Sequence, residues 1–314
     1  MVMDEIEISV VIPLYNKEHT IGRCITSVLN QTQEVNEIII INDGSTDGSR
    51  EEVILLLQEY KTYNIRFFEQ ENKGVSFARN RGVEESKCRY VAFLDADDEW
   101  DSYYIEKMSM LIKDFPAAQI YSSFHRVRDD RGVQIIPHTD LPASFTGYIT
   151  DYFVRSRTAP LINSSKVIIS KDVVEDIGGF PVESGLTEDL YVWFVILLKY
   201  RFAHINEVLV TINQNEDDSR TNRFYDYPYI IKHYYRNRES FRMLSSECKR
   251  YLLSVFSKQL IAARLSGNLF YSLRFFLIGL GLFGFRAVYT FPVLVVPRII
   301  LVKLREFRRT RLSK

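Results

Sequence analysis

Cysteine is scarce in this sequence, and the few cysteines have no spacing typical of a metal site or a disulfide framework. Cys24, Cys88 and Cys248 are odd in number and far apart in a chain of 314 residues. We therefore expect reduced thiols and a cytoplasmic environment. The first residues also lack the basic flank and long apolar core of a secretory signal, so we predict no signal peptide.

Net charge is also absent, because 40 Lys and Arg balance 40 Asp and Glu. The balance hides an asymmetry along the chain. Residues 1–220 carry 22 basic and 36 acidic side chains, a sum of −14, whereas residues 221–314 carry the other 18 and 4, a sum of +14. We predict an acidic catalytic domain over the first range and a basic helical region over the second, suited to an anionic partner such as nucleic acid or a membrane surface.

No clean apolar run is long enough to cross a membrane. Arg286 and Arg298 divide the most apolar stretch into two runs of 11 residues, 275–285 and 287–297. At about 1.5 Å per residue, neither run spans a bilayer core of about 30 Å. We predict two short helices, broken near Pro292, that lie in the membrane interface or form a shallow re-entrant hairpin.

The tail also contains the groups that would meet anionic lipid head groups. Its tyrosines could suggest base stacking on single-stranded nucleic acid, but we favour packing of an aromatic helix face on the catalytic domain and expect no nucleic-acid partner. The alternatives to attachment by residues 269–314 to the inner face of the membrane are an ordinary helical subdomain and a dimer interface. The terminal basic residues are Arg298, Lys303, Arg305, Arg308, Arg309, Arg311 and Lys314.

The first hundred residues are rich in short apolar strands that end in polar loops. Apolar runs at 8–12, 37–41, 65–68 and 90–94 are separated by helical patterns, which predicts a parallel, doubly wound α/β sheet. The carboxyl ends of such strands share one rim, where open α/β sheets bind nucleotides. The polar residues expected on that rim are Tyr15, Asp43, Lys73 and Asp95.

Residues 90–100, with the sequence YVAFLDADDEW, form an apolar strand that ends abruptly in carboxylates. Asp95, Asp97 and Asp98 would repel one another unless a cation sits among them. Mn2+ or Mg2+, bound through one or two carboxylates and phosphate oxygens, meets that need. The alternative is that the acids cap the next helix at Ser102, although one acid would suffice.

Beyond residue 100 the pattern is less regular. The sequence predicts a sharp break at the Gly178-Gly179-Phe180 segment, before a helix that begins near Asp189. The expected helices are 103–113, 171–177 and 190–200, and the expected strands are 118–126, 133–137 and 163–170.

Six short segments carry a resemblance to a known family. They are VVIPLYN at 10–16, NDGSTD at 42–47, NKGVSFARNRG at 72–82, LDADD at 94–98, GGF at 178–180 and ED at 188–189. In this order and spacing they resemble family 2 glycosyltransferases of bacterial cell-surface polysaccharide assembly. The resemblance implies a GT-A fold, a Rossmann-like and mostly parallel sheet flanked by helices, to which the tail adds a helical, membrane-associating extension.

The resemblance also implies a nucleotide site built from several loops. Pro13, Tyr15 and Asp43 would hold the nucleoside base, and Gly74 and Arg79 would line the pocket. The next acids have separate roles, with Asp95 at the ribose, Asp97 on the metal and Asp98 beside it. The complete set of expected nucleotide-binding residues is Pro13, Tyr15, Asn16, Asp43, Lys73, Gly74, Arg79 and Asp95.

Catalysis would fall to the Glu-Asp pair. We expect Asp189 to be the general base, because an inverting displacement needs a carboxylate that takes the proton from the acceptor hydroxyl. Glu188 would support the loop or the acceptor pocket. A metal held by Asp97 would stabilise charge on the departing diphosphate. The predicted reaction moves one sugar from a nucleotide-diphosphate donor, with UDP favoured by the resemblance, to a saccharide or lipid-linked saccharide.

Single-sugar transfer is predicted because the Gln-x-x-Arg-Trp pattern of processive synthases is missing after Trp193, where residues 213–219 are NQNEDDS. The family pattern is also incomplete, since Tyr191 and Val195 stand where an acid and an arginine often occur. These departures concern the acceptor side of the site.

Two rival functions remain. A nucleotidyltransferase also combines a parallel sheet with acidic metal ligands, but it would ordinarily have a glycine-rich, basic first loop, and residues 13–16 are PLYN. A nucleotide-sugar-binding scaffold without turnover would not need Asp97 and Asp189, yet both are present.

Overall fold

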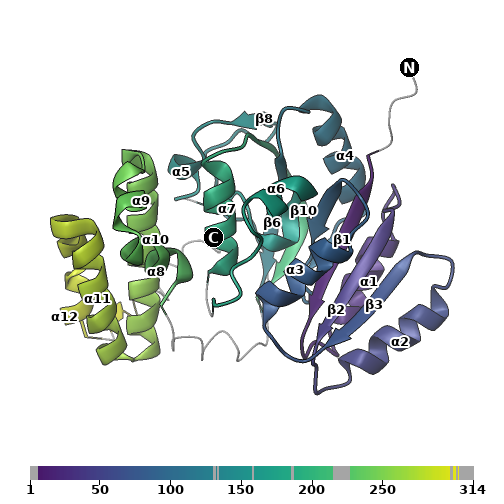
Figure 1. Cartoon of the computed structure of the whole chain (residues 1–314), viewed down its shortest axis with the longest axis horizontal. Helices are drawn as coiled ribbons and strands as arrows, with labels where there is room; N and C mark the ends of the chain where they lie inside the picture. The colour runs from purple at the N-terminus through teal and green to yellow at the C-terminus, as the bar shows by residue number, and fades with distance from the viewer. Residues whose placement is uncertain are drawn as a thin grey trace. The chain divides into compact units, whose positions relative to one another are not determined.

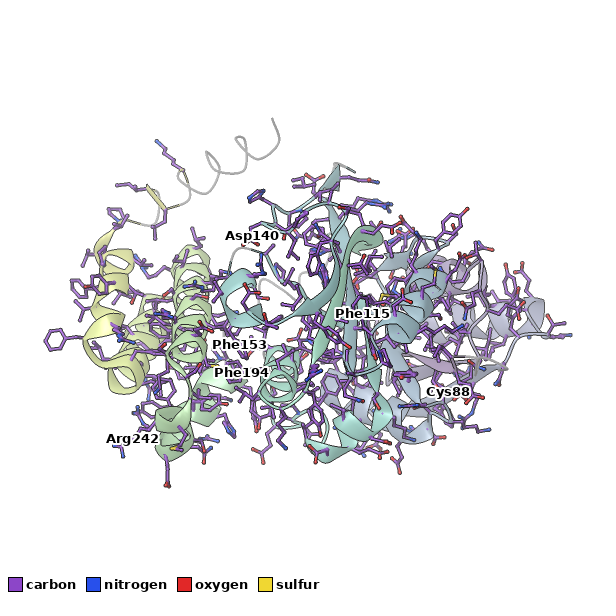
Figure 2. All side chains as sticks on the ribbon, turned by 90° about the horizontal axis from the view of Figure 1, so that it is seen from above. Cys88, Phe115, Asp140, Phe153, Phe194 and Arg242 are labelled. Carbon is purple, nitrogen blue, oxygen red and sulfur yellow. The ribbon has the colours of Figure 1, made fainter. Side chains whose placement is uncertain are left out.

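The structure is a computed structural model that describes residues 6–129, 132, 134–157, 159–184, 187–214, 227–297, 300, 301 and 303. The chain forms two compact units. The first, here the α/β unit, comprises Met1–Tyr152, Thr158–Glu183 and Asp189–Asn215. The second, here the helical unit, comprises Phe153–Arg157, Ser184–Glu188 and Glu216–Lys314. Cys88 lies in the α/β unit and Arg242 in the helical unit (Figure 2).

The first four strands form the predicted parallel half of a single sheet, in the order β3-β2-β1-β4 (Figure 1). Each strand is followed by a helix or a turn on the way to the next, as the right-handed crossover rule requires. The elements are β1 (Ile8–Leu14), α1 (Ile21–Leu29), β2 (Glu37–Asp43), α2 (Ser49–Glu59), β3 (Ile65–Gln70), α3 (Val75–Glu85) and β4 (Tyr90–Phe93).

The other half of the sheet is mixed. β9 runs antiparallel to both of its neighbours, β4 and β6, whereas β10 runs parallel to β6. Beyond them, β5 and β8 pair with β10 and β7 pairs with β6, all antiparallel. The elements are β5 (Glu99–Trp100), α4 (Tyr104–Asp114), β6 (Ile120–Arg128), β7 (Gln134–Ile135), β8 (Thr146–Ile149), α5 (Tyr152–Arg155), η1 (Ser164–Lys166), β9 (Val167–Ser170), α6 (Lys171–Asp176), α7 (Glu188–Leu197) and β10 (Phe202–Asn213).

Several expectations for this half are corrected. The expected strand over 163–170 begins with a 3-10 turn, and the strand expected over 133–137 comprises only β7. The 12-residue strand β10 was not predicted, because His204 and Asn206 interrupt its apolar pattern even though both side chains are buried. Its polar residues are satisfied by tertiary partners that the local sequence does not show.

Alternation along β1 decides which helices cover which face. Val10 and Ile12 belong to the core cluster that includes side chains of α1 and α4. Val11 points the other way, and a Cβ added to Gly82 of α3 would lie 2.2 Å from its Cγ1. Residue 82 therefore has to be glycine for α3 to approach the sheet. This two-faced burial is typical of parallel strands in α/β proteins.

The helical unit is held together by aromatic packing. Phe275 of α11 lies 4.7 Å from Phe256 of α10 and stacks on Tyr227 at 5.3 Å, measured between ring centroids. Gly279 permits this approach, since a Cβ there would lie 2.1 Å from Phe256 Cζ. Tyr227 thus packs against α11, and the predicted packing of the aromatic helix face on the catalytic domain stays a prediction. The elements are α8 (Tyr229–Arg236), α9 (Arg238–Met243), α10 (Ser246–Ser266), α11 (Leu269–Phe283), η3 (Gly284–Thr290) and α12 (Pro292–Val295).

The apolar tail forms a longer helical stretch than predicted. Helical turns run from Leu269 to Thr290 through Arg286, but the backbone breaks at Gly284 (φ 59°, ψ −141°), after α11. Phe291 before Pro292 is helical (φ −55°, ψ −39°), so the break predicted near Pro292 lies at Gly284 instead. Among the described residues, this 22-residue stretch is long and apolar enough to cross a membrane, by length and composition only. That finding is weak evidence, because core helices of soluble proteins meet the same criteria.

Candidate functional site

The loops that follow the neighbouring strands β2 and β1 are joined to each other by hydrogen bonds (Figure 1). Asn16 has a φ of 50°, in the left-handed region that few non-glycine residues adopt. Its N–H donates to Ser45 Oγ at 3.1 Å, and its Oδ1 accepts the Thr46 N–H at 2.8 Å. The next N–H, that of Lys17, donates to Ser49 Oγ at 2.7 Å. These bonds hold the first loop in a conformation that its sequence alone would disfavour.

Asp43, the last residue of β2, is buried and organises the neighbouring loop. Its Oδ1 accepts hydrogen bonds from Gln70 Nε2 and from the Lys73 N–H, and its Oδ2 accepts the Gly74 N–H at 2.8 Å. Gly74 has a φ of 91°, which favours glycine, and begins α3. Tyr15, by contrast, is 47% exposed. The two predicted base-binding residues thus differ: Tyr15 is accessible to a ligand, and Asp43 shapes the loop beside it.

Arg79 is the first unexpected feature of the acidic turn. It is buried, and its Nη2 donates to Asp95 Oδ1 at 2.8 Å. Its guanidinium also lies 5.4 Å from the centroid of the Phe180 ring. Arg81, two residues on, instead donates hydrogen bonds to the Glu69 carbonyl and to Gln70 Oε1. A buried cation therefore offsets the charge of Asp95.

Asp97 is paired with a cation from a different loop. Lys17 Nζ lies 3.0 Å from Asp97 Oδ2, and the two side chains are 19% and 16% exposed. The backbone of the turn is held separately, because Thr20 Oγ1 donates to the Ala96 carbonyl and Asn213 Nδ2 donates to the Asp97 carbonyl. Residues from β1's loop, α1 and β10 thus converge on Asp97.

Asp98 is a buried part of the turn. Its Oδ2 accepts a hydrogen bond from Ser165 Oγ, and its Oδ1 accepts the N–H of Asn213. Burial raises the pKa of Asp98 well above the usual value, and the charges of Asp97 and Asp95 add to the effect. This geometry favours a positioning role for Asp98, so its predicted contact with a metal stays a prediction.

These residues fit a divalent cation only if phosphate oxygens of a bound nucleotide supply some of its ligands. Among the described residues, no cluster of three or more His, Cys, Asp or Glu side chains could hold a metal by itself. Asp95 is 36% exposed but paired with the buried Arg79, Asp98 is buried, and Asp97 is 16% exposed and paired with Lys17. One carboxylate completed by phosphate oxygens is an ordinary arrangement for Mg2+. Asp97 fits that role once its ion pair with Lys17 is broken.

Asp189 belongs to a helix that is packed against the strand leading to Asp95. Trp193 of α7, one turn after Asp189, lies 6.4 Å from Phe93 at the end of β4, and Phe180 lies 5.3 Å from Phe93 and 5.7 Å from Trp193. Residues four apart share a helix face, so Asp189 lies on the α7 face that contains Trp193. Glu188 precedes it as the first residue of α7.

Hydrogen bonds connect the glycine break before α7 to α3. Asn80 Nδ2 donates to the Phe180 carbonyl at 2.8 Å, and the Phe180 N–H donates to Asn80 Oδ1 at 2.7 Å. Gly179 has a φ of 75°, and a Cβ there would lie 2.6 Å from Asn80 Oδ1. The Gly178-Gly179-Phe180 segment therefore connects the nucleotide rim with the helix of Asp189.

A buried basic cluster lies next to the turn residue Ser165. Lys166 Nζ lies 2.9 Å from His125 Nδ1 and donates to the Pro160 carbonyl at 2.7 Å. Burial lowers the pKa of His125 to about 2 and that of His204 to about 3, with Lys166 contributing to both. Burial also lowers the pKa of Lys166 well below its usual value. Both imidazoles are thus neutral in the folded protein.

Sequence reasoning missed Lys17, Ser165, Asn213 and the pairing of Arg79 with Asp95. Asn213 and Ser165 lie more than 60 residues from the acidic turn and carry no local signal. Lys17 could have been suspected, because it directly follows the segment 10–16 and comes just before a helix at the rim. Its partner could not, since 80 residues separate it from Asp97.

Comparison with known proteins places this rim in a family. A sequence model described as Glycosyl transferase family 2 matches residues 9–178, just over half of the chain. The chain belongs to glycosyl transferase family 2. The family resemblance inferred from the six segments is therefore confirmed, and the matched range includes every rim loop from β1 to the acidic turn.

Individual family 2 relatives come from bacterial polysaccharide assembly. The chain is 34% identical over 142 residues, 44% of its length and 54% of the relative's, to the putative teichuronic acid biosynthesis glycosyltransferase TuaG of Bacillus subtilis. It is 37% identical over 113 residues, 35% of its length and 43% of the relative's, to the Escherichia coli enzyme WfgD, a UDP-Glc:alpha-D-GlcNAc-diphosphoundecaprenol beta-1,3-glucosyltransferase. Across the curated relatives reported, the chain matches between 19% and 54% of their length.

A solved structure of similar fold covers more of this family 2 chain. The crystal structure of Staphylococcus aureus TarS 1–349 in complex with UDP-GlcNAc aligns with a TM-score of 0.60 and 16% identity, over 96% of this chain and 92% of that one. At this identity the similarity concerns the fold alone. The predicted GT-A fold is confirmed.

Proposed function

We propose that the chain is an inverting, non-processive glycosyltransferase that moves one sugar from a UDP-sugar to a hydroxyl acceptor in cell-surface polysaccharide or glycolipid assembly. The observation that carries this proposal is the physical link between the two halves of the site. Phe93, Phe180 and Trp193 pack on one another and connect the strand before Asp95 with the helix of Asp189. Donor rim and general base are thereby set on one rigid frame.

In this proposal the donor lies across the ends of the parallel strands. Tyr15 is exposed at the end of β1 and presents its ring to the nucleoside base. Arg79 holds the carboxylate of Asp95 in place for the ribose. The family 2 relative WfgD is named for a UDP-Glc donor and a diphosphoundecaprenol acceptor, which supports a UDP-sugar and a lipid-linked saccharide as the substrates of this chain.

Asp189 takes the proton from the acceptor hydroxyl as that oxygen attacks the anomeric carbon, and the bond to the diphosphate breaks on the opposite face of the sugar. General base catalysis of this kind typically contributes about 10² to 10⁴ to the rate. Glu188 supports the start of α7. A divalent cation, Mn2+ or Mg2+, would supply charge stabilisation on the leaving diphosphate, and Asp97 is the side chain that would hold it.

A donor screen tests this function. Purified full chain is incubated with UDP, GDP, ADP and dTDP sugars, with Mn2+ or with EDTA, and both thermal stabilisation and release of the nucleoside diphosphate are measured. We expect stabilisation by one nucleotide sugar and slow hydrolysis of the same donor with Mn2+. Pyrophosphate release from nucleoside triphosphates would instead indicate a nucleotidyltransferase. Donor binding without turnover on any offered saccharide acceptor would indicate a binding scaffold.

We also propose that the enzyme acts at the cytoplasmic face of the membrane and attaches peripherally through its tail. Large apolar side chains are exposed on successive turns of the Leu269–Thr290 stretch, with Phe270 at 70%, Leu277 at 63%, Phe285 at 91% and Tyr289 at 87% exposure. Apolar patches of this kind mark interaction sites. The excess of basic residues in the same part of the sequence favours an anionic lipid surface as the partner.

A further inference from the structure

Lys17 occupies a position where its ammonium competes with any metal ion for the same carboxylate. Its Nζ lies 3.0 Å from Asp97 Oδ2, and Asp97 is the acid of the turn to which the family resemblance assigns a metal, whereas Asp95 is paired with Arg79 and Asp98 is buried. A divalent cation on Asp97 would be held next to the ammonium group, where like charges repel each other by several kcal/mol at protein-surface dielectric constants. The ammonium therefore weakens the binding of a metal to this carboxylate.

The position of Lys17 is determined by the fold around it. The backbone of Asn16 lies in the left-handed region, and the hydrogen bonds to Ser45 and Thr46 maintain it there. The carbonyl of Lys17 also accepts the N–H groups of Thr20 and Ile21 at the start of α1. The anchored backbone fixes where the Lys17 side chain begins, and from there its ammonium reaches Asp97.

We propose that the Lys17 ammonium is paired with Asp97 in the free protein. When a divalent metal binds Asp97, the ammonium pairs with the donor's diphosphate instead. This inference rests on the proposed function, since it assumes a nucleoside diphosphate at the rim. The diphosphate offers the displaced ammonium a new anionic partner. Metal and nucleotide therefore bind cooperatively, and by linkage each raises the affinity of the other by the same factor.

The proposal makes Lys17 a positioning residue for the metal rather than a general phosphate contact. Removing its charge frees Asp97, so Mn2+ alone should bind more tightly. The same change removes the partner that the diphosphate would acquire, so UDP should improve Mn2+ binding less than it does in the unmodified protein. A lysine that only contacts phosphate would weaken UDP binding and leave the affinity for Mn2+ alone unchanged.

The test measures binding of Mn2+ to the full chain, with and without saturating UDP, by the electron paramagnetic resonance signal of free Mn2+. For Lys17→Met we expect affinity for Mn2+ alone to rise about tenfold, and the enhancement by UDP to fall by a similar factor. Lys17→Gln repeats the measurement with a polar side chain, should the methionine variant fold poorly. Lys17→Arg keeps the charge and Lys113→Met removes an exposed charge elsewhere, and both should match the unmodified protein.

The outcomes separate this inference from the function on which it rests. If Lys17→Met and Lys17→Gln bind Mn2+ no more tightly than the unmodified protein, while Asp97→Asn loses Mn2+-dependent UDP binding, the competition is wrong and the donor site stands. If the unmodified protein and all Lys17 variants fail to bind UDP with or without Mn2+, the proposed donor site itself is wrong. Loss of the tenfold gain in the double variant Lys17→Met/Asp97→Asn would support the inference, because the gain must pass through Asp97.

Discussion

The α/β unit and the helical unit differ in how their exposed apolar side chains are distributed. In the α/β unit the exposed large apolar residues, such as Tyr15, Leu55 and Met110, are scattered over separate elements. In the helical unit a few, such as Tyr235, Met243 and Ile261, are also scattered, but most follow one another along a single stretch, from Leu269 to Val295. Scattered exposure is normal for any soluble surface, whereas continuous exposure marks a surface that needs a partner.

The charges differ in the same sense. At the nucleotide rim of the α/β unit, Arg79 pairs with Asp95 and Lys17 pairs with Asp97, although residues 1–220 carry a sum of −14. The tail of the sequence carries its 18 basic residues with only 4 acids. The acids of the nucleotide rim are thus held in internal pairs, whereas the tail has an excess of positive charge that suits an anionic partner. Mutations should therefore be able to change sugar transfer without changing membrane attachment, and the reverse.

The largest expected effect is on turnover, from Asp189→Asn. The amide keeps the shape of the side chain but cannot accept the proton, so we expect the rate of sugar transfer to fall by about 10² to 10⁴. UDP-sugar affinity, measured by calorimetry, and sedimentation with liposomes should be unchanged. Glu188→Gln is the matched control and should cost much less. A near-normal rate for Asp189→Asn would identify another base.

The converse change should remove attachment and spare the chemistry. Replacing Phe270, Leu277 and Phe285 together by Ser removes exposed apolar area, and burial of each such side chain is worth about 1.5 to 3 kcal/mol. We expect binding to phosphatidylserine-containing liposomes to fall by about 10² or more, while UDP-sugar hydrolysis stays constant. These residues are preferable to a truncation at residue 269, which would remove the buried core residue Phe275.

Met243→Ser is the control for that experiment, since Met243 is 82% exposed in the same unit but lies on α9, outside the apolar stretch. High salt should weaken the attachment of the unmodified protein without abolishing it, because only the charge component is screened. Unchanged liposome binding by the triple variant would favour the alternative of a helical subdomain that needs no membrane.

Acid should destabilise the α/β unit through its buried histidines. Their pKa values are about 2 for His125 and about 3 for His204 in the fold, against about 6.5 in an unfolded chain. Both contributions are present above pH 6.5 and are lost as the pH falls toward 3, because only the unfolded chain takes up protons there. The unfolding free energy should drop by up to about 1.4 kcal/mol per pH unit for each histidine.

Tryptophan fluorescence in urea can follow this loss selectively, because both tryptophans, Trp100 and Trp193, belong to the α/β unit. Unfolding curves at pH 7, 6 and 5 give the slope. His204→Gln should make the slope shallower by about half. Curves that superimpose at all three pH values would show that the histidines are protonated in the fold.

The smallest expected effect concerns the start of α10. Ser245 Oγ accepts the N–H of Cys248 and so caps the helix. Ser245→Ala should destabilise the helical unit by about 1 kcal/mol, seen as a lower melting temperature by circular dichroism. Ser246→Ala, one residue inside the helix, should have little effect. Equal melting temperatures for the two variants would mean that the cap contributes nothing.

The sequence alone determined the features that repeat locally. The strands β1 to β4 are apolar runs followed by polar loops, and parallel pairing brings their carboxyl ends to one rim whatever the rest of the chain does. Residues at strand ends, such as Tyr15, Asp43 and Asp95, could therefore be placed from their position in the pattern. The six family segments are likewise readable without a structure, since each is local and only their order matters.

Only the tertiary structure decided which partner each charged residue has. Three neighbouring acids look equivalent in sequence, yet Asp95 pairs with Arg79, Asp97 with Lys17, and Asp98 is buried against Ser165 and Asn213. Strand β10, which supplies Asn213, was missed because its buried polar residues break the apolar pattern. The physical reason is the same in each case: the energy of a charge or a buried polar group depends on neighbours distant in sequence, and no local pattern records them.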